Sequence, residues 1–455
     1  MLFCLVGVVL LLGVAFWYVN TESFADHVRA KLIDVLATAT GGRVELARFS
    51  WHPLQLEAEV DGLTIHGVEA PDQVPYLHVD TLRVQAKIID AFKAQIGLRS
   101  LDVEHPVFHL IVYPDGSTNQ PVPKKQTESN KPVTDTIFDL EANRAQVNNG
   151  VLLLNQRALP FNVAANHLAT TVTYRAQPES YLGTVHVEDL TAQRDKAPAV
   201  HSTLDLNVEM ARNALKLDGL HFVTGESKLD VSGALNDFTK LNWKIGANGA
   251  IDLREVAALA AVEGLERGVT GVQIQGQGSG AKAFDVTGNV QLKDGTYRQS
   301  DLLLSGVSAT SSLHATQDEV TLPNVRVRLR QGGGVDASAK LSNYMAPAPT
   351  AEPAAAMTSS KKPPAKTASP QQEASIRARI FGIRPEMIFE IIAEPKYANL
   401  GFDAQADGTA EVRWKGSIND LVASANVTVA PPRPPTPNEI PVTGAVDASF
   451  ALRGG

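Results

Sequence analysis

The sequence predicts a mainly β, mostly antiparallel protein with an N-terminal transmembrane helix and a few short helices. Three observations support this fold class. The chain opens with a long apolar run, most of the remainder alternates apolar and polar residues with a period of two, and turn pairs interrupt this alternation at short intervals. Period-two alternation places apolar side chains on one face of a strand, and short connections make neighbouring strands antiparallel.

The first segment has the length and composition of a membrane anchor. Leu2–Val19 contains no charged residue, and as a helix it is about 27 Å long, close to the ~30 Å apolar core of a bilayer. The run ends in aromatic residues, which are typical of a membrane–water interface. The anchor positions are Leu2, Leu10, Phe16, Trp17 and Tyr18. A cleaved signal peptide is the alternative, although the sequence lacks its basic start and small-residue cleavage site.

The charges that flank the anchor give an ambiguous orientation. No Lys or Arg precedes the apolar run, whereas Arg29 and Lys31 follow it, and by the loop-charge rule this favours a cytoplasmic body. Long domains translocate largely regardless of charge, so the rule does not decide the orientation. Without a basic start, we expect the true N-terminus upstream of Met1.

An amphipathic helix is predicted directly after the anchor. Between Thr21 and Thr40, apolar residues such as Phe24 and Val28 recur at helical spacing, and Gly41-Gly42 ends the run. A second helix is predicted from Asp252 to Glu266, where Asp252 and Glu255 form a capping box. We interpret that helix as a cap on an open end of the β array.

The predicted strands begin after this first helix. The clearest alternation runs from Leu54 to Val60, and Asp61-Gly62 then predicts a turn into Leu63. Comparable turns are predicted at Asp115-Gly116, Asp218-Gly219 and Asp294-Gly295, and the whole chain holds roughly two dozen candidate strands.

Composition divides the chain into seven parts. Residues 117–134 are rich in proline and polar residues, and residues 346–372 are richer still in Pro, Ala, Ser and Lys, so we expect surface linkers there. The expected parts are an anchor (1–20), an amphipathic helix (21–42), a β module (43–116), a linker (117–134), β repeats (135–345), a disordered loop (346–375) and continuing β structure (376–455). The last part stops in mid-pattern, as expected of a fragment.

Charge and residue usage give no indication of catalysis. A net charge of −8 without a dense basic patch predicts no nucleic-acid partner. The only cysteine, Cys4, lies in the anchor, and the histidines lack metal-ligand spacing, so we predict no metal site. No nucleotide-binding or nucleophile motif occurs, so we expect no cofactor and no enzyme activity. The arginines at 326, 328 and 330 are interpreted as a solvated strand face, with lipid phosphate as the alternative partner.

Several motifs in the first 120 residues resemble the AsmA-like superfamily, and most closely its TamB-type translocation and assembly proteins. After the anchor and helix, the strand Gly42-Arg43-Val44-Glu45-Leu46 matches the Gly-Arg-x-Val strand of that group. A unit of strand, short helix, strand and proline corresponds to Leu82–Val84, a helix at Ile88–Ile96, and Leu101–His105 with Pro106. The Asp-Gly-x-x-Asn signature occurs from Asp115 to Asn119.

The resemblance implies an elongated, U-shaped, repeating β-groove with an apolar interior. It implies a single-pass inner-membrane protein with its body in the periplasm, moving phospholipid between the inner and outer membranes in support of outer-membrane biogenesis. The implied partners are the inner membrane, phospholipid acyl chains and an outer-membrane barrel protein of the TamA kind. The alternative function is a scaffold for translocation and assembly of outer-membrane β-barrel proteins, and an envelope enzyme is a third.

An apolar groove suits lipid physically. A diacyl lipid carries around 30 methylenes, and at about 0.8 kcal/mol each their exposure to water costs on the order of 25 kcal/mol. The expected lipid-facing residues are Leu204, Leu206, Val208, Val272, Ile274, Val325, Val327 and Leu329. A closed sandwich whose inner faces pack on each other has the same alternation, so periodicity alone leaves open groove and sandwich undecided.

Overall fold

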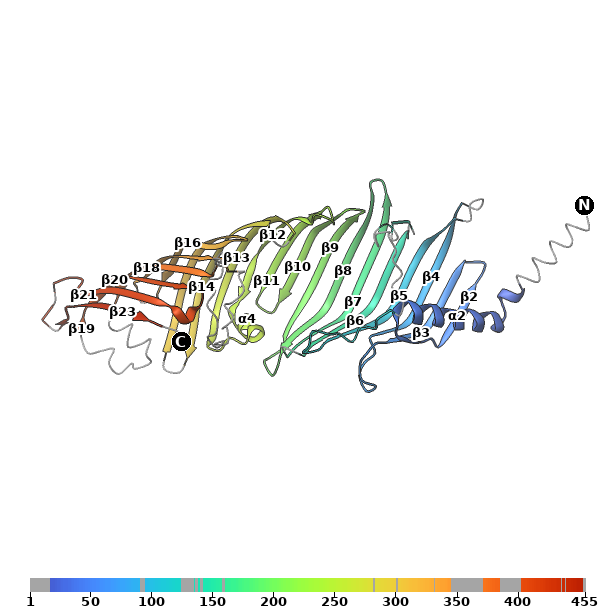
Figure 1. Cartoon of the computed structure of the whole chain (residues 1–455), viewed down its shortest axis with the longest axis horizontal. Helices are drawn as coiled ribbons and strands as arrows, with labels where there is room; N and C mark the ends of the chain where they lie inside the picture. Colours follow the sequence, from blue (N-terminus) through green and yellow to red (C-terminus); the bar gives the residue numbers. More distant parts are fainter. Residues whose placement is uncertain are drawn as a thin grey trace, which may run out of the picture. The chain divides into compact units, whose positions relative to one another are not determined.

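The computed structural model forms two units that are described separately (Figure 1). It describes residues 17–90, 95–123, 135, 138–139, 142–157, 160–280, 283–299, 302–330, 332–344, 371–384, 402–434, 436–437 and 439–452. Unit 1 comprises Met1–Phe238 and Ala258–Ala261, and unit 2 comprises Thr239–Ala257 and Val262–Gly455. Both are mainly β, as predicted, and their strands are mostly antiparallel.

The first described element is α2 (Glu22–Thr40), the helix expected from sequence. The Thr21 hydroxyl accepts a hydrogen bond from the amide of Phe24 at 3.3 Å and caps the N-terminus. Gly41 ends the helix at a φ of +78°, with its amide donating to the carbonyl of Ala37 at 2.9 Å.

Helix α2 covers one edge of the sheet in unit 1. It contacts β1 (Arg43–Glu45) and β2 (Arg48–His52), the two short strands that pair side by side with β3 (Glu57–His66). The buried side chains beneath it are Val44, Leu46, Phe49, Val60, Leu63, Ile65 and Val79, and the helix adds Val28, Leu32, Ile33 and Leu36. This compact core packs the helix against the face of the first strands of the sheet.

The remaining strands of unit 1 follow one another in chain order. The strands are β4 (Leu77–Asp90), β5 (Gln95–Val112), β6 (Arg144–Gln156), β7 (Phe161–Ala176), β8 (Glu179–Arg194), β9 (Val200–Ala211), β10 (Ala214–Thr224) and β11 (Lys228–Asn236). Each pairs with the next from β3 to β11. The β5–β6 pair is parallel, and the other pairs are antiparallel.

Unit 2 repeats this arrangement with its own strands. The large sheet holds β12 (Asn242–Asp252), β13 (Leu265–Ser279), β14 (Ala283–Gln299), β15 (Leu302–Thr316), β16 (Glu319–Arg328), β17 (Gly334–Ser342), β18 (Glu373–Ile383), β20 (Gln405–Lys415), β21 (Val422–Ala430) and β23 (Gly444–Ala451). These strands pair in that order, all antiparallel. A small parallel pair joins β19 (Phe402–Asp403) and β22 (Ile440–Pro441), and a 3₁₀ turn, η2 (Ile418–Asp420), follows β20.

The helix predicted at Ile88–Ile96 is wrong. Strand β4 continues to Asp90 and β5 begins at Gln95, and Ile88 is paired in register with Ile96. A short apolar run carries too little periodicity to separate helix from strand, and here pairing between the two long strands determines the outcome.

Most of the predicted Asp-Gly turns are irregularities inside strands. Gly62, at a φ of +62°, lies in the middle of β3, and the register of β10 shifts beside Gly219. Asp294, at a φ of +53°, and Gly295 lie within β14, where the register also shifts. A left-handed residue serves a β-bulge as readily as a hairpin. Only Asp115-Gly116 makes the predicted turn, in which the amide of Gly116 donates to the carbonyl of Tyr113.

Other boundaries also differ from the prediction. Helix α4 (Leu253–Ala260) begins after Asp252, whose Oδ1 accepts from the amide of Arg254 at 2.7 Å, but it ends six residues before Glu266. Left-handed backbone at Ala261 and Gly264 leads instead into β13. Leu54, predicted in a strand, is 88% exposed in a turn before β3.

The structure describes only the ends of the two predicted linkers, and residues 124–134 and 345–370 lie outside the described residues. Residues 117–123 are ordered against the sheet of unit 1, and Asn119 is fully buried. Strand β18 begins at Glu373, so the last residues of the range 346–375 are strand and not loop.

Candidate functional site

One face of the unit 1 sheet carries apolar side chains in rows that cross the strands. The register of β8 to β11 aligns these side chains because each strand alternates in the same phase. One row is Val185, Leu206, Leu220 and Val231, and the next is Val187, Leu204, Phe222 and Leu229. Val208 pairs with Gly183 and Leu217 in a third row. The structure therefore brings the three predicted residues of β9 onto one apolar face.

Unit 2 shows the same rows over more strands. From β16 to β23, one row is Val327, Val335, Ile380, Gly408, Val427 and Val446, and its neighbour is Val325, Ala337, Ala378, Ala410, Ala425 and Ala448. In β13, Val272 pairs with Val290 and Ile274 with Gly288. Leu329 departs from the prediction, because it follows the end of β16 and its amide donates to Gly333 in the turn to β17.

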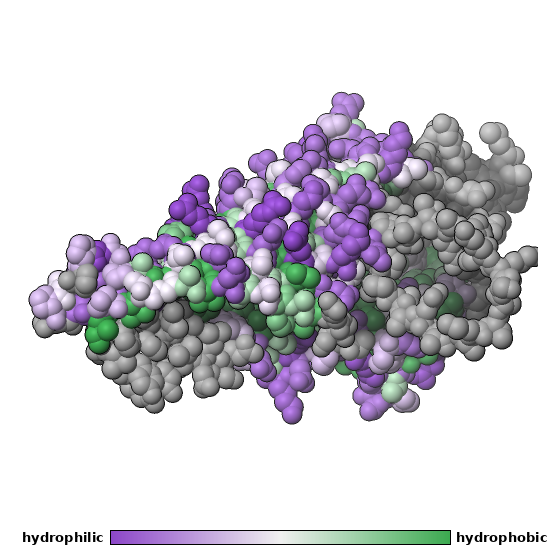
Figure 2. Space-filling view, turned by 60° about the vertical axis from the view of Figure 1, so that its left-hand side comes forward, coloured by the Kyte–Doolittle hydropathy of each residue, from purple (hydrophilic) through white to green (hydrophobic). Residues whose placement is uncertain are grey.

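The predicted apolar residues are half-buried. None of the eight is fully buried, and none is fully exposed. In both units, the described strands that carry them belong to one large hydrogen-bonded sheet. In Figure 2, which brings unit 2 forward, hydrophilic residues cover the upper surface and hydrophobic residues gather below them.

The opposite face of unit 1 carries histidines and aspartates in a row of its own. His186, Asp205, His221 and Asp230 occupy paired positions on β8, β9, β10 and β11. The Nδ1 atom of His186 lies 2.6 Å from Asp205, and that of His221 lies 2.5 Å from Asp230. The histidines were considered only for metal-ligand spacing along the chain, which does not relate them to these aspartates. Aligning consecutive strands at period-two positions is the signal that would have paired them.

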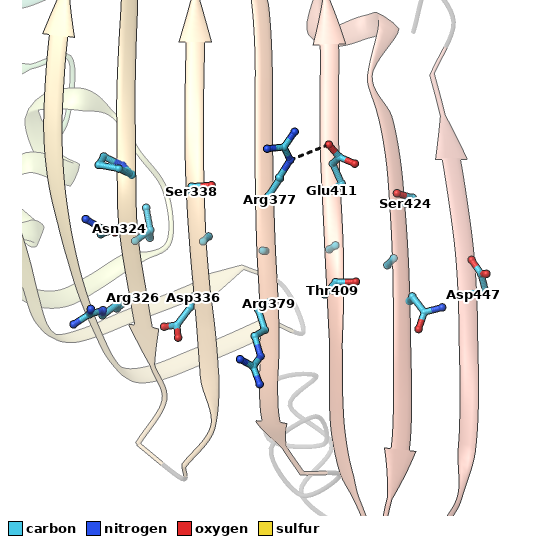
Figure 3. A pocket seen from close by; sticks show the side chains of 17 residues that line it. Asn324, Arg326, Asp336, Ser338, Arg377, Arg379, Thr409, Glu411, Ser424 and Asp447 are labelled. Carbon is cyan, nitrogen blue, oxygen red and sulfur yellow. Dashed lines mark hydrogen bonds and ion pairs between the residues drawn. The ribbon is translucent and has the colours of Figure 1, made fainter.

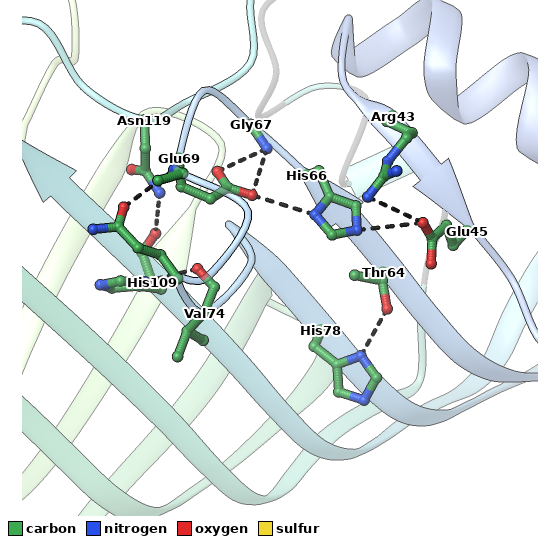
Figure 4. A network of polar contacts seen from close by, with 12 residues as sticks. Arg43, Glu45, Thr64, His66, Gly67, Glu69, Val74, His78, His109 and Asn119 are labelled. Carbon is green, nitrogen blue, oxygen red and sulfur yellow. Dashed lines mark hydrogen bonds and ion pairs between the residues drawn. The ribbon is translucent and has the colours of Figure 1, made fainter.

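The histidines near α2 hold the sheet edge together (Figure 4). His66 lies between Glu45, at 3.6 Å, and Glu69, at 3.5 Å, while the hydroxyl of Thr64 lies 2.8 Å from Nδ1 of His78. On the same strand as His78, Asp80 lies 2.8 Å from His105, and this contact lowers the pKa of the Asp80 carboxyl.

The hydrogen bonds of Asn119 explain why the Asp-Gly-x-x-Asn signature ends in asparagine. Its side-chain nitrogen donates to the carbonyl of His109 at 2.9 Å (Figure 4). Its side-chain oxygen accepts from the amide of Ile111 at 2.8 Å. Both atoms satisfy buried backbone of β5, so the motif has a structural role.

The polar face of unit 2 contains a hollow of about 750 Å³ (Figure 3). Its side chains come from β16, β17, β18, β20, β21 and β23. Charged lining residues are Arg326, Asp336, Arg377, Arg379, Glu411 and Asp447, with Asn324, Ser338, Thr409, Ser424 and Asn426 between them. Residues of one apolar row also line the hollow, at the positions between these polar side chains: Val325, Ala337, Ala378, Ala410 and Ala425.

No metal centre is present in the part of the chain that the structure describes. There, no group of three or more His, Cys, Asp or Glu side chains is placed to hold an ion. That the protein has no cofactor and no enzyme activity remains a prediction from the sequence.

The predicted anchor lies largely outside the described residues. Leu2, Leu10 and Phe16 are not among them, while Trp17 is 70% and Tyr18 46% exposed. The ring of Tyr18 meets that of Phe24 edge-on at 5.6 Å. Among the residues described, no helix has both the length and the apolarity needed to span a bilayer.

No protein-family model matches the sequence, and no curated protein matches it.

Proposed function

We propose that this chain carries phospholipid acyl chains along the apolar faces of its sheets, as an inner-membrane-anchored periplasmic protein of the AsmA-like kind. In this role it moves phospholipid between the inner and outer membranes and supports outer-membrane biogenesis. The observation that supports the proposal most is the pair of half-buried apolar faces, each formed by cross-strand rows.

A half-buried aliphatic row still exposes apolar surface to water, so part of its hydrophobic stabilisation is not realised. Apolar side chains gain about 25 cal/mol for each Å² removed from water, and the rows of β9 and β13 forgo part of this gain while they remain in contact with solvent. An acyl chain laid along the rows removes water from itself and from the protein at once. Aliphatic walls without converging polar groups fix no single position, so a chain can slide from one strand to the next.

The polar reverse face suits the same role. In unit 1, side chains such as Asn207 and His221 keep that face hydrated while Leu206 and Leu220 face the other way. A sheet with one wet face and one apolar face can lie in an aqueous compartment and still shield lipid tails.

Photo-crosslinking at adjacent residues tests the proposal. A photoreactive amino acid at Leu206 or Ile274 is expected to capture phospholipid in membranes. The same amino acid at Asn207 or Gln273, one residue away and on the polar face, is the matched control. Lipid adducts are measured by mass spectrometry of the purified chain.

Two results overturn the proposal. Equal lipid labelling at the apolar and polar positions removes the distinction between the faces. Capture of a polypeptide at Leu206 and Ile274 in place of lipid favours the assembly-scaffold alternative.

A further inference from the structure

We propose that the hollow on the polar face of unit 2 binds a phosphate group through Arg326 and Arg379. The two arginines occupy paired positions on either side of Asp336, because Arg326 of β16 pairs with Asp336 of β17, which pairs with Arg379 of β18. Two strand spacings separate them, about 10 Å. The long side chains of both can reach one anion seated between them.

The carboxylate between the arginines is already neutralised. Asp336 accepts from Nη1 of Arg328 at 2.7 Å, and the guanidinium of Arg328 also lies over the ring of Phe381 at 4.8 Å. Likewise, Glu411 of the same hollow is paired with Arg377 at 3.3 Å (Figure 3). These pairs leave Arg326 and Arg379 as the cations available to a ligand.

Neither arginine has an intramolecular partner. Across the residues that the structure describes, the side chains of Arg326 and Arg379 make no hydrogen bond or ion pair. Their row continues with Thr409 and Asn426, whose side chains are also unpaired there. The corresponding face of unit 1 is different, because its histidines and aspartates are hydrogen-bonded to one another.

The shape and chemistry of the hollow fit a phosphate-bearing ligand. A volume of about 750 Å³ falls in the range of small-molecule sites, and a neighbouring hollow of about 480 Å³ shares Asn324 and Arg326. Guanidinium groups bind phosphate oxygens in pairs, and hydroxyl and amide groups complete the hydrogen bonds. Asp447 lies three strand spacings from Arg379, about 14 Å, too far to neutralise it.

This inference does not rest on the proposed function, because it depends on the arginine side chains and not on the apolar ones. The phosphate can belong to a soluble compound or to a lipid headgroup. The experiment separates these sources by titrating the full chain with inorganic phosphate and, in parallel, with phosphatidylglycerol vesicles.

Phosphate binding is measured by isothermal titration calorimetry at low ionic strength. Arg326→Gln and Arg379→Gln are each expected to raise the dissociation constant about 10-fold. Arg377→Gln removes the same charge from the same hollow but from an existing ion pair, so it is expected to change the constant less than about 3-fold. Circular dichroism melting checks that each variant is folded.

Each result of this titration either supports or overturns phosphate binding by Arg326 and Arg379. Arginine-dependent binding of inorganic phosphate alone supports a soluble ligand, and arginine-dependent binding of vesicles supports a headgroup. If neither probe binds, if Arg326→Gln and Arg379→Gln leave binding unchanged, or if Arg377→Gln weakens binding as much as Arg326→Gln, the inference is overturned.

Discussion

A single carboxylate in the apolar row of unit 1 is expected to reduce the lipid carried by the protein. Leu206 lies between Val185 and Leu220 on the neighbouring strands, so Leu206→Glu introduces a charge into an otherwise aliphatic row. About three methylenes of an acyl chain lying over this position lose their apolar contact, which at about 0.8 kcal/mol each amounts to about 2–3 kcal/mol. The expected loss of occupancy at the row is therefore about 30- to 150-fold.

Asn207→Glu is the control. It places the same carboxylate one residue away, on the face that already carries Asp205. Phospholipid that copurifies with each variant is extracted and quantified per mole of protein, and urea unfolding of the same samples reports their stability. If Leu206→Glu retains as much lipid as Asn207→Glu in folded protein, acyl chains do not use this row and the reasoning is refuted.

Three further predictions concern the sheet edge of unit 1. Asn119→Ala leaves buried backbone groups at Ile111 and His109 without partners and is expected to cost about 2–4 kcal/mol in urea unfolding, so a loss below about 1 kcal/mol contradicts the assigned role. Gly67→Ala places a methyl group against the carbonyl of Asn119 and is expected to cost about 1–3 kcal/mol by the same assay, whereas an unchanged midpoint rejects that contact. The lowered pKa of Asp80 means that its contact with His105 stabilises the fold above the ordinary range near pH 4, and the contribution is lost as the pH falls through the lowered pKa. His105→Gln should therefore reduce the fall in urea midpoint between pH 5 and pH 2, and an identical fall in both proteins opposes this.

Local sequence signals predicted the helices where caps and periodicity agreed. Thr21 and Gly41 bound α2 as expected, and Asp252 begins α4. The short run at Ile88–Ile96 lacked such signals and was assigned wrongly, because long-range pairing of β4 with β5 decides its conformation. An Asp-Gly pair indicates a left-handed backbone conformation but not whether it lies in a hairpin turn or in a β-bulge. The sequence alone therefore could not distinguish Gly62 and Gly295, which lie inside strands, from glycines of turns.

The apolar face was predictable because strand alternation is local, whereas the rows depend on register. Leu204, Leu206 and Val208 alternate visibly in the sequence, but their partners on β8 and β10 follow only from pairing across hairpins. The His–Asp row and the hollow around Arg326 depend on register in the same way. Alternation therefore predicted which residues share a face, and register determined which of them meet.

Quenching by lipid tails tests most directly whether acyl chains lie on the apolar faces. In a Cys4→Ser background, a bimane fluorophore is attached to Leu206→Cys or Ile274→Cys, with Asn207→Cys and Gln273→Cys as controls. Phospholipid that carries a nitroxide on its acyl chain is then added. If acyl chains lie on the apolar faces, quenching is strong at positions 206 and 274 and weak at 207 and 273. Equal quenching at all four positions would contradict this placement of the acyl chains.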